Sequence, residues 1–150
     1  MSKKYPEPRK WRPKHPEKYV GDINKIILRS GLEIKFANWC DNQTNIIRYA
    51  SEEIVIPYLS PDGKIHRYFC DFWIEVKATD NSIKRYLVEI KPDVQTRAPV
   101  LTESLQRNRK RYLTEMMTWL VNSAKWDAAR KFCEKNGMEF IIITEKHLRA

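Results

Sequence analysis

Two runs of strand-forming residues on either side of a polar turn limit how the middle of this chain can fold. The runs cover residues 65–77 and 84–91, and Thr79-Asp80-Asn81-Ser82 between them has a composition typical of turns. In an antiparallel hairpin, directly opposed residues share a face of the sheet, and a slip of one residue turns every side chain to the other face. The hydrophobic pattern therefore predicts one register for this hairpin.

In the register that satisfies the apolar pattern, the position numbers of opposed residues add to 160. Asp71 then faces Glu89, and Glu75 faces Arg85 as an opposite-charge pair. The other face becomes continuously apolar, which is what burial of that face requires. Its pairs are Cys70 with Ile90, Phe72 with Val88 and Ile74 with Tyr86.

The predicted register brings two acids and a lysine to one end of the hairpin. Asp71 and Glu89 are directly opposed, and Lys91 shares the face of Glu89 because side chains two residues apart along a strand point the same way. A second Glu-x-Lys sequence starts at Glu75, but Glu75 lies roughly 13 Å along the strand from Asp71, which is too far to share one ion. The pattern favours an ion-binding site at Asp71, Glu89 and Lys91. The alternative is a solvated strand face on which basic groups offset the repulsion between the carboxylates.

Two carboxylates beside a lysine are suited to hydrolysis of a phosphodiester. Mg2+ takes oxygen ligands, usually from one or two carboxylates together with water and substrate phosphate. Such a cation polarises the phosphoryl oxygen and lowers the pKa of an attacking water. We therefore expect Asp71, Glu89 and the backbone carbonyl of Ile90 to bind Mg2+, with Mn2+ as the other candidate ion. Lys91 is expected to orient the water or to stabilise the transition state.

An Asp followed on the next strand by Glu-x-Lys resembles the PD-(D/E)XK nuclease superfamily. The resemblance extends over residues 67–72, although Cys70 stands where proline is typical. Residues 123–133 and 140–145 are similar to the final helix and strand of the transposon-end endonuclease branch. The resemblance implies an α/β fold with a restriction-endonuclease-like core, in which helices flank a mixed β-sheet. It also implies that the protein is a Mg2+-dependent deoxyribonuclease. The expected activity is that of an endonuclease, with exonuclease activity as a second option.

Taken whole, the chain resembles a family of bacteriophage nucleases that act during virion assembly, when a DNA-filled head is made ready for its tail. This resemblance implies double-stranded DNA as the substrate, phage head or neck proteins as partners, and action in the host cytoplasm or in the virion. Two alternatives stay open. One is a junction-resolving or restriction-type endonuclease with the same core, and the other is a non-enzymatic DNA-binding structural head protein.

Many nucleases of this superfamily carry a further acid on a helix before the sheet, and Glu33 is the candidate here. Residues 30–33 (SGLE) also match a capping box, in which Ser30 accepts a hydrogen bond from a backbone amide and Glu33 returns one. The capping role alone explains this glutamate equally well, so both roles stay open. Glu52 and Glu53 are weaker candidates, because they precede a strand-like run and are expected at its edge.

Length and charge suit one basic domain. The chain has 150 residues and a formal net charge of +9, which indicates a polyanionic partner or high solubility. Cys40, Cys70 and Cys133 do not have the spacing of zinc ligands, and we expect their thiols to be reduced. No apolar run is long enough to span a bilayer, so we expect cytosolic synthesis and no membrane contact.

The first 20 residues differ in composition from the rest of the chain. Residues 21–150 are expected to form the nuclease domain. The first 20 residues contain four of the eight prolines, and proline excludes a regular helix. We expect an extended basic arm that binds DNA or protein. Lys10 and Arg12 are expected to contact phosphates. Tyr5 and Trp11 are expected to stack on bases. The alternative is a solubilising tail without a partner.

The remaining pattern predicts alternating helices and strands. Residues 22–28 are expected to be helical and to join the Ser30 helix, with a break at Gly31. Gly137 is expected to follow the last helix as its C′ residue. The other expected elements are strands near 46–50, 53–59 and 139–144, and helices at about 102–120 and 123–136.

One face of the expected helix at 102–120 is basic, and this helix begins soon after Lys91. We expect the cluster to flank the site and to contact the substrate backbone. The alternative is an ordinary solvated helix face. The cluster consists of Arg107, Arg109, Lys110 and Arg111.

Overall fold

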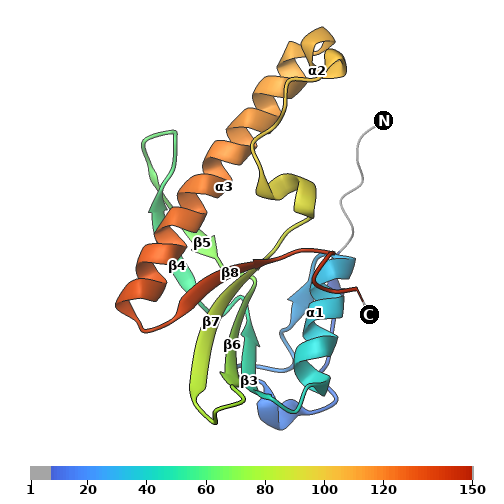
Figure 1. Cartoon of the computed structure of the whole chain (residues 1–150), viewed down its shortest axis with the longest axis vertical. Helices are drawn as coiled ribbons and strands as arrows, with labels where there is room; N and C mark the ends of the chain where they lie inside the picture. The colour runs from blue at the N-terminus through green and yellow to red at the C-terminus, as the bar shows by residue number, and fades with distance from the viewer. Residues whose placement is uncertain (1–7, 150) are drawn as a thin grey trace.

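A four-stranded mixed sheet lies at the centre of the computed structural model, which describes residues 8–149 (Figure 1). The strand order is β3-β6-β7-β8; the first two pairs are antiparallel, and β7 pairs with β8 in parallel. This architecture confirms the predicted α/β fold with a mixed sheet. The strands are β3 (Ile46–Ser51), β6 (Phe72–Lys77), β7 (Ile83–Ile90) and β8 (Glu139–Ile143).

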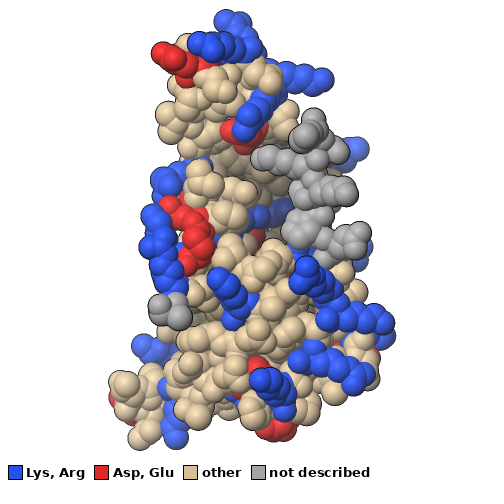
Figure 2. Space-filling view, turned by 90° about the vertical axis from the view of Figure 1, so that its right-hand side faces the viewer, with Lys and Arg blue, Asp and Glu red and all other residues tan. Residues whose placement is uncertain are grey.

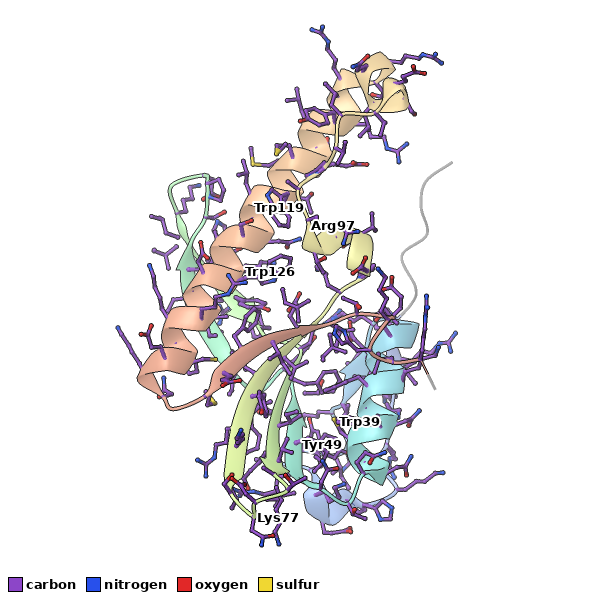
Figure 3. All side chains as sticks on the ribbon, in the orientation of Figure 1. Trp39, Tyr49, Lys77, Arg97, Trp119 and Trp126 are labelled. Carbon is purple, nitrogen blue, oxygen red and sulfur yellow. The ribbon has the colours of Figure 1, made fainter. Side chains whose placement is uncertain are left out.

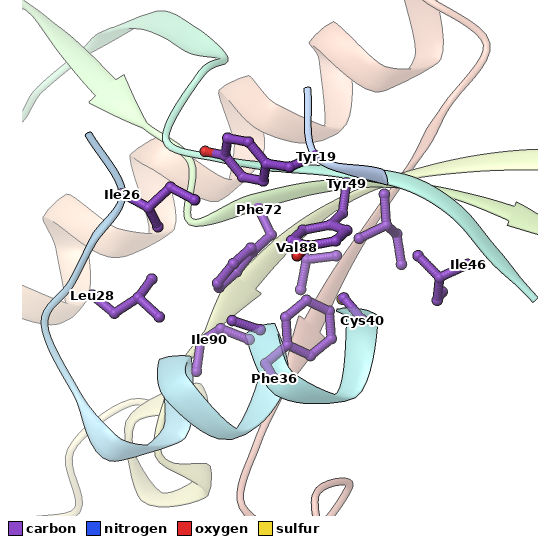
Figure 4. Packing of buried hydrophobic residues seen from close by; sticks show 12 residues of the cluster. Tyr19, Ile26, Leu28, Phe36, Cys40, Ile46, Tyr49, Phe72, Val88 and Ile90 are labelled. Atoms are coloured by element: carbon purple, nitrogen blue, oxygen red, sulfur yellow. The ribbon is translucent and has the colours of Figure 1, made fainter. Parts of the chain in front are cut away.

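Helices cover both faces of this sheet, as expected (Figure 1). α1 (Gly31–Asn42) packs on one face, where Phe36 and Phe72 belong to one buried cluster (Figure 4). α3 (Arg109–Lys135) covers the other face, where Trp126 joins a second cluster with residues of β7 and β8. Burial of one large apolar side chain contributes about 1.5–3 kcal/mol, so these clusters hold the helices to the sheet.

β6 and β7 pair in the predicted register. Phe72 is opposite Val88 and Glu75 is opposite Arg85, so the numbers of opposed residues add to 160. Phe72 and Val88 are buried on the face that α1 covers. The alternation of apolar residues was sufficient to predict this part of the sheet.

The prediction of one continuous strand over 65–77 is wrong. β5 (Ile65–Phe69) ends before Cys70 and pairs with β4 (Val55–Leu59) in a separate two-stranded sheet. The backbone N–H of Cys70 donates to a carbonyl just before β4, which extends this pairing and keeps Cys70 out of the central sheet. Cys70 therefore packs in the cluster on the α3 side and does not face Ile90.

The prediction of a helix over 22–28 is also wrong. Its last two residues form β2 (Ile27–Leu28), which pairs with β1 (Arg9–Lys10). Ile26 and Leu28 are buried, while Ile27 between them is exposed. This alternation has the period of a strand, because successive strand residues point to opposite faces.

The two helices expected over 102–120 and 123–136 are one continuous helix, α3, preceded by the short α2 (Glu103–Arg107). No glycine or proline interrupts the sequence where the break was expected. The break falls instead at Asn108, whose side chain accepts a hydrogen bond from the backbone N–H of Arg111 and so caps α3.

The remaining elements agree with the prediction. β3, β4 and β8 begin and end within two residues of their expected bounds. Gly137 follows α3 with a left-handed φ of 66°. Cys40, Cys70 and Cys133 are free and buried. Among residues 8–149, no helix has the length and apolar composition needed to cross a membrane.

Residues 8–20 of the predicted arm lie against the domain. Trp11 packs against the buried cluster of α1. The Lys18 ammonium donates to three carbonyls at the C-terminal end of α1, where its charge also complements the helix dipole. Besides β1, the stretch contains a short 3-10 helix, η1 (Pro16–Lys18). Tyr5 lies outside the described residues.

Glu75 connects three strands of the central sheet. It is buried, and it accepts hydrogen bonds from Arg48 on β3 at 3.2 and 3.0 Å and from Arg85 on β7 at 3.0 Å. The hydrogen bond from Arg48 is the main cause that lowers the pKa of the Glu75 carboxyl, and Arg85 adds to this effect. The triad resists a slip of either neighbouring strand, because a slip would leave a buried charge without its partners.

We expect Glu75→Gln to lower the free energy of unfolding by about 2 kcal/mol, since hydrogen bonds to charged groups contribute about 1.5–3 kcal/mol. Folding lowers the pKa of this carboxyl, so its contribution is present above the ordinary pKa and is lost as the pH falls through the lowered value. Urea unfolding in steps from neutral to acidic pH measures this difference. The control is Glu134→Gln at an exposed position. Equal effects of the two substitutions at neutral pH would contradict the role of the triad.

Candidate active site

Asp71 lies at the bend between β5 and β6, beside the end of β7. Its Oδ2 accepts a hydrogen bond from the backbone N–H of Ile90 at 2.7 Å. The register of β6 and β7 makes this contact, because the first residue of β6, Phe72, is opposite Val88. Asp71 precedes Phe72 and Glu89 follows Val88, so both acids lie just beyond this last pair. They are close enough for their charges to interact.

Glu89 is buried at the end of β7, and both of its carboxylate oxygens have partners. The hydroxyl of Tyr68 on β5 donates to Oε2, and the Lys91 ammonium lies 3.4 Å from Oε1. Tyr68 was not indicated by the sequence pattern. No local signal marks it, because β5 carries it to Glu89 only after the chain bends at Asp71.

Glu33, in the first turn of α1, is within electrostatic reach of the same acids. Its backbone N–H donates to the Ser30 hydroxyl at 3.1 Å, and its Oε2 accepts from the backbone N–H of Arg29 at 3.1 Å. The capping box is therefore present, with the return bond moved one residue toward the N-terminus. Burial is the main cause that raises the pKa of Glu33, and the charges of Glu52 and Glu89 add to it. The Glu33 side chain can therefore cap α1 and lie close to the other acids at the same time.

Glu52 brings a further acid close to this cluster. It directly follows β3 with a left-handed φ of 54°, which is uncommon for a residue with a side chain. Its backbone N–H donates to the carbonyl of Asp71 at 3.1 Å, and its carboxylate lies 3.4 Å from the Arg29 guanidinium. Strained backbone of this kind is concentrated at functional sites, and here it joins the end of β3 to the bend at Asp71.

The clustering of acids changes the proton affinity of Asp71. Burial is the main cause that raises the pKa of its carboxyl well above the ordinary value, and the charges of Glu89 and Glu33 add to the increase. The N–H of Ile90 and the charge of Lys91 act in the opposite direction. In the absence of a further cation, three carboxylates therefore repel one another around one lysine.

The donor groups of this cluster suit a hard divalent cation. Within residues 8–149, no set of three or more His, Cys, Asp or Glu side chains is arranged to enclose a metal ion. Mg2+ does not need such an enclosure, because it commonly binds through one or two carboxylates and keeps several waters. Asp71 and Glu89 supply this number, and a cation beside them would relieve their repulsion. Ile90 presents its N–H to Asp71, and binding by its carbonyl stays a prediction.

The second Glu-x-Lys sequence, at Glu75 and Lys77, has a different environment. Glu75 is held by the guanidinium groups of Arg48 and Arg85. Lys77 is exposed at the opposite end of β6 from Asp71 (Figure 3). Two motifs that share the pattern Glu-x-Lys therefore have different surroundings, because they lie at different positions in the hairpin.

The predicted basic cluster lies at the end of α3 that projects from the sheet (Figure 1), and not directly beside Asp71. In the chain, a loop with the short 3-10 helix η2 (Asp93–Thr96) separates β7 from α2 and this cluster. Figure 2 shows Lys and Arg side chains gathered at this end of the molecule. The cluster consists of Arg107 in the last turn of α2 and Arg109, Lys110 and Arg111 in the first turn of α3.

The candidate residues of the N-terminal segment have structural contacts. The Trp11 indole N–H donates to Asn38 at 3.1 Å, and its ring meets Tyr49 edge-on with centroids 6.4 Å apart. Arg12 donates to a nearby asparagine side chain at 2.6 Å, and Lys10 is exposed in β1. Stacking of Trp11 on a base would require these packing contacts to break, whereas Lys10 and Arg12 can reach a phosphate from the surface.

Two comparisons with known proteins relate to this geometry. Residues 43–145 match the family model described as TnsA-like endonuclease N terminal. The chain is also 43 % identical over 143 residues to a head completion nuclease of Enterobacteria phage T4, and the alignment covers 94 % of this chain and 93 % of that protein. Asp71, Glu89 and Lys91 lie within the range matched by the family model, and Glu33 lies before it.

We expect Asp71→Asn to raise the unfolding temperature of the metal-free protein at neutral pH, because asparagine can still accept from Ile90 and no longer repels Glu89. A carboxyl whose pKa is raised on folding destabilises the folded state as the pH increases from the ordinary to the raised value. The gain should therefore grow with pH across this window and be absent in acid. Thermal unfolding in EDTA over this pH range measures it. A variant no more stable than the wild type at mildly basic pH would refute the repulsion.

Tyr68→Phe should lower the free energy of unfolding by about 1–3 kcal/mol, since the buried carboxylate of Glu89 would lose a hydrogen bond. Chemical unfolding in EDTA measures the change. Tyr58→Phe on the neighbouring β4 is the matched control, because Tyr58 is also buried and its hydroxyl makes no hydrogen bond with residues 8–149. If both variants lose the same stability, the Tyr68 hydroxyl does not hold Glu89.

Proposed function

The chain belongs to the TnsA-like endonuclease family, and on this premise we propose that it is a divalent-metal-dependent DNA nuclease that acts in bacteriophage head completion. Family membership agrees with the predicted resemblance to the transposon-end endonuclease branch. It makes the enzyme a hydrolase that acts on DNA. The observation that carries the proposed site is the meeting of Asp71, Glu89 and Lys91 at one end of the β6–β7 hairpin.

In the proposed reaction, the oxygen of a water forms a bond to phosphorus and one bridging P–O bond breaks. The water loses a proton to solvent or to a base in the site, and the leaving oxygen takes one up. Lys91 stabilises the negative charge that develops on the phosphoryl group, because its ammonium lies at the rim of the acidic cluster. Tyr68 holds one oxygen of Glu89, and the N–H of Ile90 holds Asp71.

Asp71 and Glu89 would hold Mg2+ or Mn2+, and the Ile90 carbonyl is a further candidate ligand. When bound, such a cation polarises the phosphoryl oxygen and lowers the pKa of the attacking water. Glu33 would contact the cation or one of its waters from the first turn of α1. Its proximity to Glu89 supports this role.

The basic end of α3 is proposed to contact the DNA backbone. The first turn of α3 contains three cations and no acid, which opposes the helix dipole. This locally unfavourable arrangement suits a surface that meets phosphates, because a helix N-terminus and its cations both attract anions. Lys10 and Arg12 in the N-terminal segment would add a second phosphate contact.

The place of this reaction in head completion is supported by the similarity to the phage T4 protein. We infer that the nuclease acts in the host cytoplasm during assembly or in the virion, on double-stranded DNA, and beside head or neck proteins. The basic net charge of +9 fits a polyanionic substrate.

Nicking of supercoiled plasmid DNA in Mg2+ tests the proposed site. We expect the wild type to nick the plasmid, and we expect Asp71→Asn and Lys91→Ala to do so at least about 1000-fold more slowly, because each removes several kcal/mol of transition-state stabilisation. EDTA should abolish nicking, and added Mg2+ or Mn2+ should restore it in the wild type.

Lys77→Ala is the matched control for Lys91→Ala, since both lysines end a Glu-x-Lys sequence and only Lys91 lies beside the acidic cluster. This variant should nick at the wild-type rate. Equal nicking by wild type and Asp71→Asn, or none by either protein, would overturn the assignment of the site.

A further inference from the structure

The half of α3 that projects from the sheet (Figure 1) carries a stripe of exposed apolar side chains. Leu113, Met117 and Leu120 recur at helical spacing, and their exposed fractions are 65 %, 53 % and 44 %. The C-terminal half of α3, in contrast, packs on β4 and β8 through residues such as Trp126 and Cys133. A solvated helix half needs no apolar stripe, and an exposed patch of this kind marks an interaction surface.

A shallow hollow of about 710 Å³ follows this stripe. Leu113, Met117 and Val121 form its apolar floor, and Lys110 and Lys125 stand at its two ends. None of the described residues that line it is acidic. The two lysines are 15 positions apart, roughly 22 Å along a helix at 1.5 Å per residue. The hollow thus offers an apolar centre with a positive charge at each end.

We propose that this hollow binds a segment of another protein in which apolar side chains are flanked by acidic residues, and that the segment belongs to a protein of the phage head. The assignment of the partner to the head rests on the proposed function. The chemistry of the segment rests on the hollow itself. Apolar residues would fill the centre, and carboxylates would pair with Lys110 and Lys125. Lys110 would then serve the protein segment, and the DNA contact at this end of α3 would rest on Arg107, Arg109 and Arg111.

Charge and composition disfavour two other occupants. A second copy of the chain, packed antiparallel through the same stripe, would bring Lys110 of each copy toward Lys125 of the other, and like charges oppose such pairing. DNA would gain from the lysines and from the basic first turn of α3, but the Leu and Met side chains of the floor offer nothing to a phosphate backbone. A protein segment with apolar residues between acidic ones can pack on the apolar floor and pair with the lysines at both ends.

Photo-crosslinking identifies the occupant. The full chain, with a photoreactive residue at position 117 in the apolar floor, is incubated with purified DNA-filled heads that were assembled without this protein. We expect a crosslink to a head protein, at a segment where mass spectrometry finds apolar residues flanked by Asp or Glu. A crosslink to DNA, to another copy of this chain, or to a segment without acidic flanks would overturn the proposal, and so would the absence of any crosslink.

Met117→Lys tests the energetic role of the apolar floor. A buried lysine would disrupt an apolar contact, whereas it would preserve or strengthen a contact with DNA. We expect at least tenfold weaker co-sedimentation with the heads, unchanged affinity for plasmid DNA, and unchanged plasmid nicking. Ile83→Lys is the matched control, because Ile83 is also an exposed apolar residue, at 54 %, but lies on β7 away from the stripe.

Equal binding of the heads by Met117→Lys and the wild type would refute the docking surface. Parallel loss of binding by Ile83→Lys would refute it as well, since it would show a general effect of added charge. Failure of the wild type to nick DNA would count against the proposed function alone, because co-sedimentation does not depend on hydrolysis.

Discussion

The antiparallel pairing of β6 with β7 is the interaction on which the rest of this structure depends. It buries Phe72 against α1 and places Glu75 between Arg48 and Arg85. The same register brings Asp71 to the N–H of Ile90 at the end of the hairpin. A slip of one residue would expose the apolar face and leave Glu75 without its partners. The stability of the fold and the geometry of the acidic cluster therefore have one cause.

The acidic cluster lowers the stability of the folded protein locally, and the surrounding contacts offset this loss. Burial and neighbouring charges raise the pKa values of Asp71 and Glu33, so their ionised forms are unfavourable at the site. Tyr68 and a backbone N–H nevertheless hold the carboxylates in place. Such an arrangement is expected where a protein binds a cation, because binding recovers what the repulsion removes from stability. Further along the same strand, Glu75 has two guanidinium partners, Arg48 and Arg85, so the excess of acid is confined to the end at Asp71.

Prediction from the sequence succeeded where the pattern is local and periodic. Alternating apolar residues predicted the register of β6 and β7, and the capping signal at Ser30 predicted the start of α1. Prediction failed where two distant segments compete for one stretch of chain. Residues 65–77 have strand character throughout, but β4 pairs with the first part and the central sheet with the second, so the chain bends at Cys70 and Asp71. The proximity of Tyr68 to Glu89 follows from that bend, and it could not be predicted without it.

The sequence by itself determined the hairpin register and the pair of acids with a lysine at one strand end. Both follow from side-chain alternation, which a chain carries in its own order of residues. The mixed α/β class followed from the resemblance to a nuclease superfamily. Only the tertiary structure decided that Tyr68 reaches Glu89, that Trp11 is packed, and that half of α3 projects with an apolar stripe exposed. The physical reason is that a periodic pattern specifies which side of an element is apolar, while the partner that covers it, or its absence, depends on segments far away in the chain.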